Sequence, residues 1–136
     1  MINRLKAIFK SFQEHNVNYL VIGGIAAILY GVPRATFDLD ILIEKSEENV
    51  GRLLEALIAA GITSAELTDV DGILHHEISI FKDQVRIDVQ TQTPGLVFED
   101  AWKRRTIMQY RGQEFYVVSK DDLIASKKAS ARPVDL

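Results

Sequence analysis

Three aspartates in two β-rich segments are the residues of this sequence best suited to carry out chemistry. Asp38 and Asp40 are separated by one residue in the predicted strand 37–44, and Asp88 lies in a second predicted strand, 85–90. Alternate residues of a strand share a face, so Asp38 and Asp40 project together with Cβ atoms roughly 7 Å apart. Mg²⁺ takes oxygen ligands and is usually held by few carboxylates plus substrate phosphates. Without cysteine or clustered histidine, the pattern favours a magnesium–phosphate site over a zinc site.

A glycine pair precedes these aspartates, between a predicted buried strand (17–22) and a short apolar helix (25–30). Gly23 and Gly24 have no side chains, so their backbone N–H groups can approach phosphate oxygens, and a helix N-terminus adds partial positive charge. The pair is therefore a candidate for the phosphate end of a substrate whose reacting part lies at the aspartates. A Gly-Gly pair alone is more often just a turn, so this role depends on the aspartates.

The spacing of apolar residues predicts the elements that must position these side chains. In the segment 37–44, Leu39, Ile41 and Ile43 point to one side of a strand and the two aspartates to the other. In the segment 85–90, Asp88 shares its face with Arg86 and projects like the earlier pair. Two surfaces are therefore expected on each strand, one apolar and one carrying carboxylates.

The remaining segments predict helices and hairpins around these strands. Helical spacing and N-cap residues predict helices at 3–14, at 46–61 with Ser46 as N-cap, at 97–105, and at 120–131 with Ser119 as N-cap. Two antiparallel hairpins are expected, one from 75–81 and 85–90 and one from 106–110 and 114–118. This order predicts a single α/β (α+β) domain over residues 1–136, with a mixed β-sheet flanked by helices.

Composition narrows the class of protein. The chain has 136 residues, of which 47% are hydrophobic, which is enough for one core and too few for two ordinary domains. The net charge is −3 and no run of five basic residues occurs, so a general footprint for duplex nucleic acid is absent from the sequence. There is no cysteine in the sequence, and it shows neither the apolar run typical of a signal peptide nor an apolar run long enough to cross a bilayer. A cytoplasmic location is expected.

The combined pattern resembles the DNA polymerase β-like nucleotidyltransferase superfamily, in particular its small bacterial and archaeal members, which include toxin–antitoxin and phage-abortive systems. The resemblance is carried by Gly23-Gly24, Asp38-x-Asp40 and Asp88, extended by Arg34-x-Thr36 before Asp38. Near the C-terminus, Asp122-Leu123-Ile124-x-x-Lys127 and Arg132-Pro133-x-Asp135 also resemble the segment that the small members have. The resemblance spans most of the chain and implies the nucleotidyltransferase fold.

The resemblance implies transfer of a nucleoside monophosphate from a nucleoside triphosphate to a hydroxyl, with release of pyrophosphate. Two Mg²⁺ ions would serve as cofactors of this reaction. Asp38 and Asp40 would bind both ions, while Asp88 would hold the catalytic ion and could accept the proton of the attacking hydroxyl. Gly23 and Gly24 would cradle the β and γ phosphates. The expected nucleotide-binding set is completed by Arg34, Thr36 and Lys127.

The acceptor of the nucleotide stays open, because the sequence fits a protein, a tRNA end or a small hydroxyl compound equally. An antitoxin or other partner chain, or further C-terminal sequence, could supply acceptor recognition. A second hypothesis from another class is a non-catalytic nucleotide-binding or toxin–antitoxin interaction module on the same fold. That module would bind a triphosphate or a partner without turnover.

Other polar clusters have simpler interpretations. The segment 69–72 (Asp-Val-Asp-Gly) lacks the remaining ligands of a calcium loop and is expected to form a turn. His75 and His76 are adjacent in the predicted strand 75–81, so they should face opposite sides and not share a metal. The basic run 103–105 (Lys-Arg-Arg) is expected on a solvated helix face, with a nucleic-acid contact as the alternative. Phe98 with Trp102 is expected to pack that helix.

Overall fold

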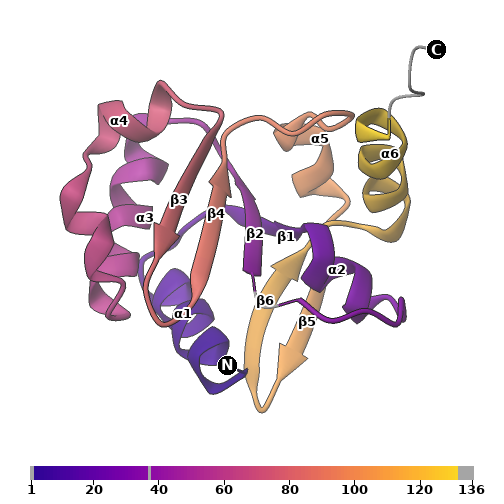
Figure 1. Cartoon of the computed structure of the whole chain (residues 1–136), viewed down its shortest axis with the longest axis horizontal. Helices are drawn as coiled ribbons and strands as arrows, with labels where there is room; N and C mark the ends of the chain where they lie inside the picture. Colours follow the sequence, from indigo (N-terminus) through magenta and orange to yellow (C-terminus); the bar gives the residue numbers. More distant parts are fainter. Residues whose placement is uncertain (1, 37, 132–136) are drawn as a thin grey trace.

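A six-stranded mixed sheet forms the centre of the computed structural model, which describes residues 2–36 and 38–131 (Figure 1). The strand order is β3-β4-β2-β1-β6-β5. The two central contacts of interest are β2 with β4, which is parallel, and β2 with β1, which is antiparallel. The strands are β1 (Tyr19–Ile22), β2 (Asp38–Ile43), β3 (Ile78–Lys82), β4 (Arg86–Gln90), β5 (Thr106–Tyr110) and β6 (Gln113–Val117).

Helices flank this sheet. In Figure 1, α1, α3 and α4 gather on one side of the molecule and α2, α5 and α6 on the other. Within the described residues, every helix is too short or too polar to cross a lipid bilayer. The expected mixed sheet with flanking helices is confirmed. The helices are α1 (Ile2–Glu14), α2 (Gly23–Leu29), α3 (Glu47–Ala59), α4 (Val70–Leu74), α5 (Phe98–Lys103) and α6 (Lys120–Ser130), with a 3₁₀ helix at Thr63–Leu67.

The core lies against the apolar faces of β2 and β4. Leu39, Ile41 and Ile43 of β2 have no exposed surface, and Ile87 of β4 is equally buried. Asp38 and Asp40 are only partly buried, as expected for the opposite face of the strand. Burying one face of β2 therefore fixes its register and holds the aspartates on the other face.

Side-chain caps set two helix starts where the sequence predicts them. The hydroxyl of Ser46 accepts a hydrogen bond from the backbone N–H of Asn49 at 3.2 Å, and the hydroxyl of Ser119 accepts one from Asp122 at 3.1 Å. The start of α2 differs from the prediction, because this helix begins at Gly23 rather than at residue 25. The glycine pair thus forms the first turn of this helix instead of a separate turn before it.

The segment before β3 corrects the prediction for the two histidines. The sequence places them in a strand, but His75 and His76 follow α4 and precede β3, which begins at Ile78. Each ring nitrogen Nδ1 pairs with a backbone carbonyl four residues earlier, at 2.7 Å for His75 and 2.6 Å for His76. The physical reason is Asp69, whose carboxylate accepts from the N–H of Gly72 at 2.8 Å and starts a helix where a turn was expected.

Candidate active site

The parallel pairing of β2 and β4 brings the three aspartates onto one surface. Asp40 of β2 is the register partner of Asp88 of β4, and Asp38 is the partner of Arg86. Neighbouring strands lie about 4.8 Å apart, so the four side chains form a compact square on one face of the sheet. The side chain of Asp88 is more enclosed than that of Asp38, with 16% of its surface exposed against 43% for Asp38.

Arg86 bridges two of these carboxylates. Its Nε donates to Oδ1 of Asp88 at 2.9 Å, and its terminal Nη2 donates to Oδ2 of Asp88 at 3.3 Å. The same Nε lies 3.9 Å from Oδ2 of Asp38. Sequence reasoning put Arg86 on the carboxylate face but gave it no role. The signal was present, since residues at i and i+2 of a strand share a face and arginine matches a carboxylate with two parallel donors.

The surroundings of Asp40 disfavour the charged form of its carboxyl group. Its pKa is raised from 3.8 to about 6, first because burial penalises the charged carboxylate and then because Asp88 and Asp38 add negative charge nearby. A hydrogen bond between the carboxyl groups of Asp40 and Asp88 acts in the same direction, while Arg86 opposes it. The pKa of Arg86 itself is raised, chiefly by its hydrogen bond to Asp88. The cluster is therefore short of positive charge.

The donor set fits a hard cation. The site offers carboxylate oxygens and neither sulfur nor imidazole, which is the ligand chemistry of Mg²⁺. In residues 2–36 and 38–131, however, no three acidic, histidine or cysteine side chains are arranged around one metal position. The guanidinium of Arg86 lies among these carboxylates, where it donates a hydrogen bond to each oxygen of Asp88 and competes with a cation for them.

The glycine corner, formed by Gly23 and Gly24 at the start of α2, is in direct contact with the cluster of carboxylates. Gly23 has a φ of +69°, which glycine adopts without steric cost, and a Cβ added there would collide with Oδ2 of Asp40. At Gly24, which is buried, an added Cβ would lie 3.2 Å from Cγ2 of Thr36. Gly23 is therefore required for close packing of the α2 start against Asp40, whereas a side chain at Gly24 would ask Thr36 to shift by a few tenths of an ångström.

The other residues of the expected nucleotide-binding set lie at different places. The hydroxyl of Thr36 accepts a weak hydrogen bond from the backbone N–H of Asp38 at 3.4 Å, so it belongs to the corner. Arg34 and Lys127 are exposed, and within the described residues neither forms an ion pair with an acidic side chain. Their roles stay predictions. The motif at 132–135 lies outside the described residues, as does Phe37.

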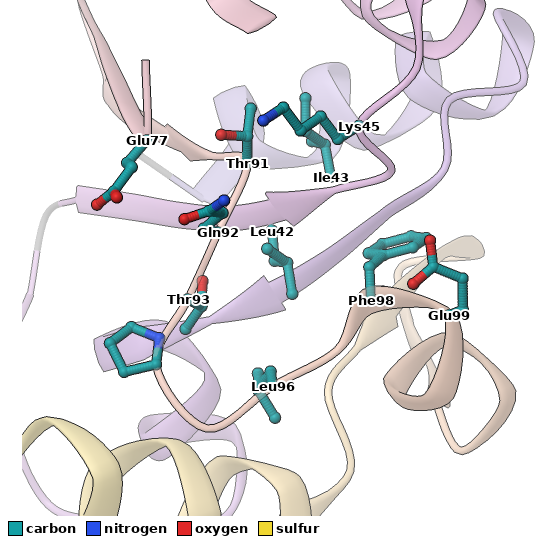
Figure 2. A pocket seen from close by; sticks show the side chains of 11 residues that line it. Leu42, Ile43, Lys45, Glu77, Thr91, Gln92, Thr93, Leu96, Phe98 and Glu99 are labelled. Atoms are coloured by element: carbon teal, nitrogen blue, oxygen red, sulfur yellow. The ribbon is translucent and has the colours of Figure 1, made fainter. Parts of the chain in front are cut away.

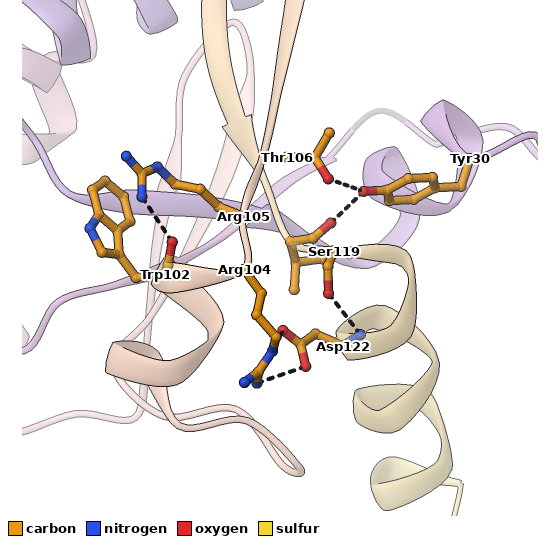
Figure 3. A network of polar contacts seen from close by, with 8 residues as sticks. Tyr30, Trp102, Arg104, Arg105, Thr106, Ser119 and Asp122 are labelled. Atoms are coloured by element: carbon orange, nitrogen blue, oxygen red, sulfur yellow. Dashed lines mark hydrogen bonds and ion pairs between the residues drawn. The ribbon is translucent and has the colours of Figure 1, made fainter.

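Two sets of polar contacts lie near the start of α6 (Figure 3). Arg104 donates from Nε and Nη2 to the two oxygens of Asp122, each at 3.0 Å. Nearby, the hydroxyl of Tyr30 donates to the carbonyl of Val118 at 2.8 Å and pairs with the hydroxyl of Thr106 at 2.9 Å. The first set joins the end of α5 to the start of α6, the helix that carries Lys127. The second joins the end of α2 to the β5–β6 hairpin.

The basic run 103–105 is largely occupied by such contacts. Arg104 pairs with Asp122, and the guanidinium of Arg105 lies 3.9 Å from the ring centre of Trp102 and donates to the Trp102 carbonyl at 2.9 Å. The rings of Phe98 and Trp102 stack with centroids 5.6 Å apart, which confirms their packing role. Lys103 and Arg104 are exposed, as the sequence predicts for the run, whereas Arg105 is half-buried against Trp102.

A cavity of about 650 Å³ opens beyond the aspartates, at the ends of β2 and β4 (Figure 2). Leu42, two residues after Asp40 on the same face of β2, forms part of its wall. Its volume suits a group the size of a small-molecule ligand. The lining combines apolar side chains with charged ones of both signs: Leu42, Ile43, Lys45, Glu77, Thr91, Gln92, Thr93, Pro94, Leu96, Phe98 and Glu99.

Comparison with known proteins adds a family and a fold. The model of a family described as a nucleotidyltransferase of unknown function (DUF6036) matches residues 2–136. The crystal structure of a candidate nucleotidyltransferase from Thermotoga maritima superposes with a TM-score of 0.63, covering 93% of this chain and 82% of that chain at 14% sequence identity. At that identity the likeness shows the fold alone. No curated protein matches the sequence.

Proposed function

The chain belongs to the DUF6036 family of nucleotidyltransferases, and from this we propose that it moves a nucleoside monophosphate from a nucleoside triphosphate to a hydroxyl. The observation that carries the proposal is the pairing of Asp40 with Asp88 across β2 and β4, with Asp38 on the same face. Family membership supports nucleotidyl transfer in general. The metal, the triphosphate and the residue roles below belong to the proposal.

Asp38, Asp40 and Asp88 would hold two Mg²⁺ ions, which when bound offset the charge of the reacting phosphates and activate the attacking oxygen. The hydroxyl oxygen forms a bond to the α-phosphorus while the bond to the pyrophosphate oxygen breaks. Asp88 accepts the proton that the hydroxyl loses, directly or through water. For this, its carboxylate must be free of Arg86, whose two hydrogen bonds it now accepts.

The glycine corner is proposed to bind the β and γ phosphates, which leave as pyrophosphate. The backbone of Gly23 contacts the carboxylate of Asp40, so phosphates bound by Gly23 and Gly24 would extend from the metal-binding face. Thr36, beside Gly24, would bind the same phosphates through its hydroxyl. Arg34 and Lys127 are proposed to add positive charge, and both are exposed and able to turn toward a bound anion.

The acceptor is proposed to be a protein, a tRNA end or a small hydroxyl compound, presented by a partner chain such as an antitoxin or bound directly. A non-catalytic nucleotide-binding or toxin–antitoxin module is the second candidate. It is favoured by one observation, the closure of both Asp88 oxygens by Arg86. A catalytic protein must open that pair, whereas a binding module need not.

A label-transfer screen tests the proposed function. The protein is incubated with Mg²⁺, each α-³²P nucleoside triphosphate and cell extract or tRNA, and labelled products are separated by size. Transfer by the wild type and loss of transfer in Asp88→Asn would support catalysis. Equal transfer by wild type, Asp38→Asn and Asp88→Asn would refute it. Triphosphate binding by calorimetry without any transfer would favour the binding module.

A further inference from the structure

Arg86 occupies the position where the carboxylate cluster needs positive charge. It hydrogen-bonds both oxygens of Asp88 and lies 3.9 Å from Asp38, so one guanidinium spans two of the three proposed metal ligands. Arginine stays protonated at any ordinary pH. It therefore cannot release Asp88 by losing a proton, and the side chain must move for the carboxylate to accept a cation.

The surroundings of Arg86 permit that movement. Its side chain is 39% exposed, and the contacts that hold it within the described residues are those to Asp38 and Asp88. On its other side, the register partner in β3 is Lys82, an exposed residue that repels the guanidinium rather than holding it. Among the described residues, rotation of the long side chain away from Asp88 therefore breaks no hydrogen bond or ion pair other than these.

We propose that Arg86 is an internal counter-cation, meaning a positive side chain that takes the place of the metal on Asp88 and gives it up when nucleotide arrives. In the free protein it competes with the divalent cation. When a triphosphate binds, pairs of its phosphate oxygens offer the guanidinium new acceptors that match its two parallel donors. This inference rests on the proposed function, and it adds a coupling in which triphosphate makes the metal bind more tightly.

Binding linkage makes the coupling measurable without turnover. If triphosphate raises metal affinity, metal must raise triphosphate affinity by the same factor. Mn²⁺ serves as the probe, because free Mn²⁺ can be counted by its electron paramagnetic resonance signal. Titrations are run with and without a triphosphate that has a non-hydrolysable α–β bridge, on wild type and on Arg86→Gln. Glutamine keeps a polar side chain and removes the charge and the paired donors.

The expected result is that Arg86→Gln binds Mn²⁺ alone about tenfold more tightly than wild type, because the cation no longer displaces a charge-assisted pair. The enhancement of Mn²⁺ binding by the triphosphate analogue should be smaller in Arg86→Gln than in wild type. Arg86→Lys, which keeps the charge without the paired donors, should fall between the two. Circular dichroism melting of each variant verifies that it is folded.

Lys82→Gln is the matched control. Lys82 is the cross-strand partner of Arg86 and its removal deletes the same charge from the same face without touching an aspartate pair. An equal gain in Mn²⁺ affinity from Lys82→Gln would overturn the proposal, because general charge would then explain the effect. Unchanged or weaker Mn²⁺ binding by Arg86→Gln would also overturn it.

Failure of this inference is distinguishable from failure of the proposed function. If Mn²⁺ binding depends on Asp88 but is the same in wild type and Arg86→Gln, the counter-cation role is wrong and the metal site stands. If neither wild type nor Arg86→Gln binds Mn²⁺ in an Asp88-dependent way, with or without the analogue, the metal site itself is wrong. Each outcome supports or contradicts a different statement.

Discussion

The backbone of Gly23 lies against the carboxylate of Asp40. The contact arises because β1 and β2 are antiparallel neighbours and Ile22, the residue before Gly23, is the register partner of Asp40. The left-handed φ of +69° at Gly23 turns the chain out of β1 and into α2 at this point. The glycine corner and the carboxylate cluster are thus parts of one site rather than two neighbouring ones.

Gly23→Ala is expected to damage metal binding more than stability. The new Cβ would collide with Oδ2 of Asp40 and displace the carboxylate, which should weaken Mn²⁺ binding by about 10- to 100-fold. The positive φ should add a backbone penalty of about 1–2 kcal/mol. Mn²⁺ titration and thermal melting measure the two effects separately.

Gly112→Ala is the control for backbone strain. Gly112 has a φ of +83°, and a Cβ added there would meet nothing within 4 Å. It should lose stability like Gly23→Ala and keep the Mn²⁺ affinity of the wild type. If both variants lose Mn²⁺ affinity equally, the contact between Gly23 and Asp40 has no special role.

Acid is expected to weaken metal binding at this site. Because the pKa of Asp40 is about 6, a falling pH protonates this carboxyl before an ordinary aspartate, and the cation must then displace a proton. Mn²⁺ affinity should fall about tenfold for each pH unit below 6. Titrations at pH 5, 6 and 7.5 check this, and an affinity that stays flat down to pH 5 would contradict the assigned environment.

Asp40→Asn should make the metal-free protein more stable at neutral pH. A carboxyl whose folded pKa is raised from 3.8 to about 6 contributes stability below pH 3.8 and loses it as the pH rises through 6. At pH 7.5 the charged Asp40 is therefore unfavourable, and its removal should raise the melting temperature by a few degrees in EDTA. The gain should shrink toward pH 4.5.

Added Mg²⁺ is expected to reverse the order of the melting-temperature effects predicted for EDTA. A ligand that binds only the folded protein raises its melting temperature, so wild type should gain stability with Mg²⁺ and triphosphate analogue while Asp40→Asn should not. A protein in which Asp40 is merely a solvated surface residue would show neither the gain in EDTA nor the loss of the ligand effect.

The tie between Arg104 and Asp122 predicts a structural variant. Asp122→Asn keeps the size of the side chain but loses the charge that accepts two hydrogen bonds from Arg104. The melting temperature should fall by several degrees, because Asp122 is buried at the start of α6 and Arg104 would lose its partner. Asp121→Asn, at an exposed position on the same turn, should change it by about a degree or less.

Local patterns predicted much of this fold. Alternation in β2 and β4 placed Asp38, Asp40 and Asp88 on polar faces, and the caps at Ser46 and Ser119 were predicted from single residues. The strand order and the register of Asp40 with Asp88 are set by contacts far apart in sequence, so no local pattern could give them. The role of Arg86 depends on that register, because only the parallel pairing puts it beside Asp38.

His75 and His76 show where a prediction from local pattern was wrong. The predicted strand begins at residue 75, but the carboxylate of Asp69 caps the start of α4, and His75 and His76 follow that helix instead. A local hydrogen bond thus outweighed the strand pattern. The same carboxylate explains why the segment 69–72 does not remain a simple turn.

Anomalous scattering from Mn²⁺ tests the central claim most directly. Crystals of the wild-type protein are soaked with Mn²⁺ and a triphosphate that has a non-hydrolysable α–β bridge, and data are collected near the manganese edge. The account predicts peaks bounded by the carboxylates of Asp38, Asp40 and Asp88, with Arg86 turned away from Asp88. Bound nucleotide with manganese located elsewhere, or with Arg86 still paired to both oxygens of Asp88, would contradict it.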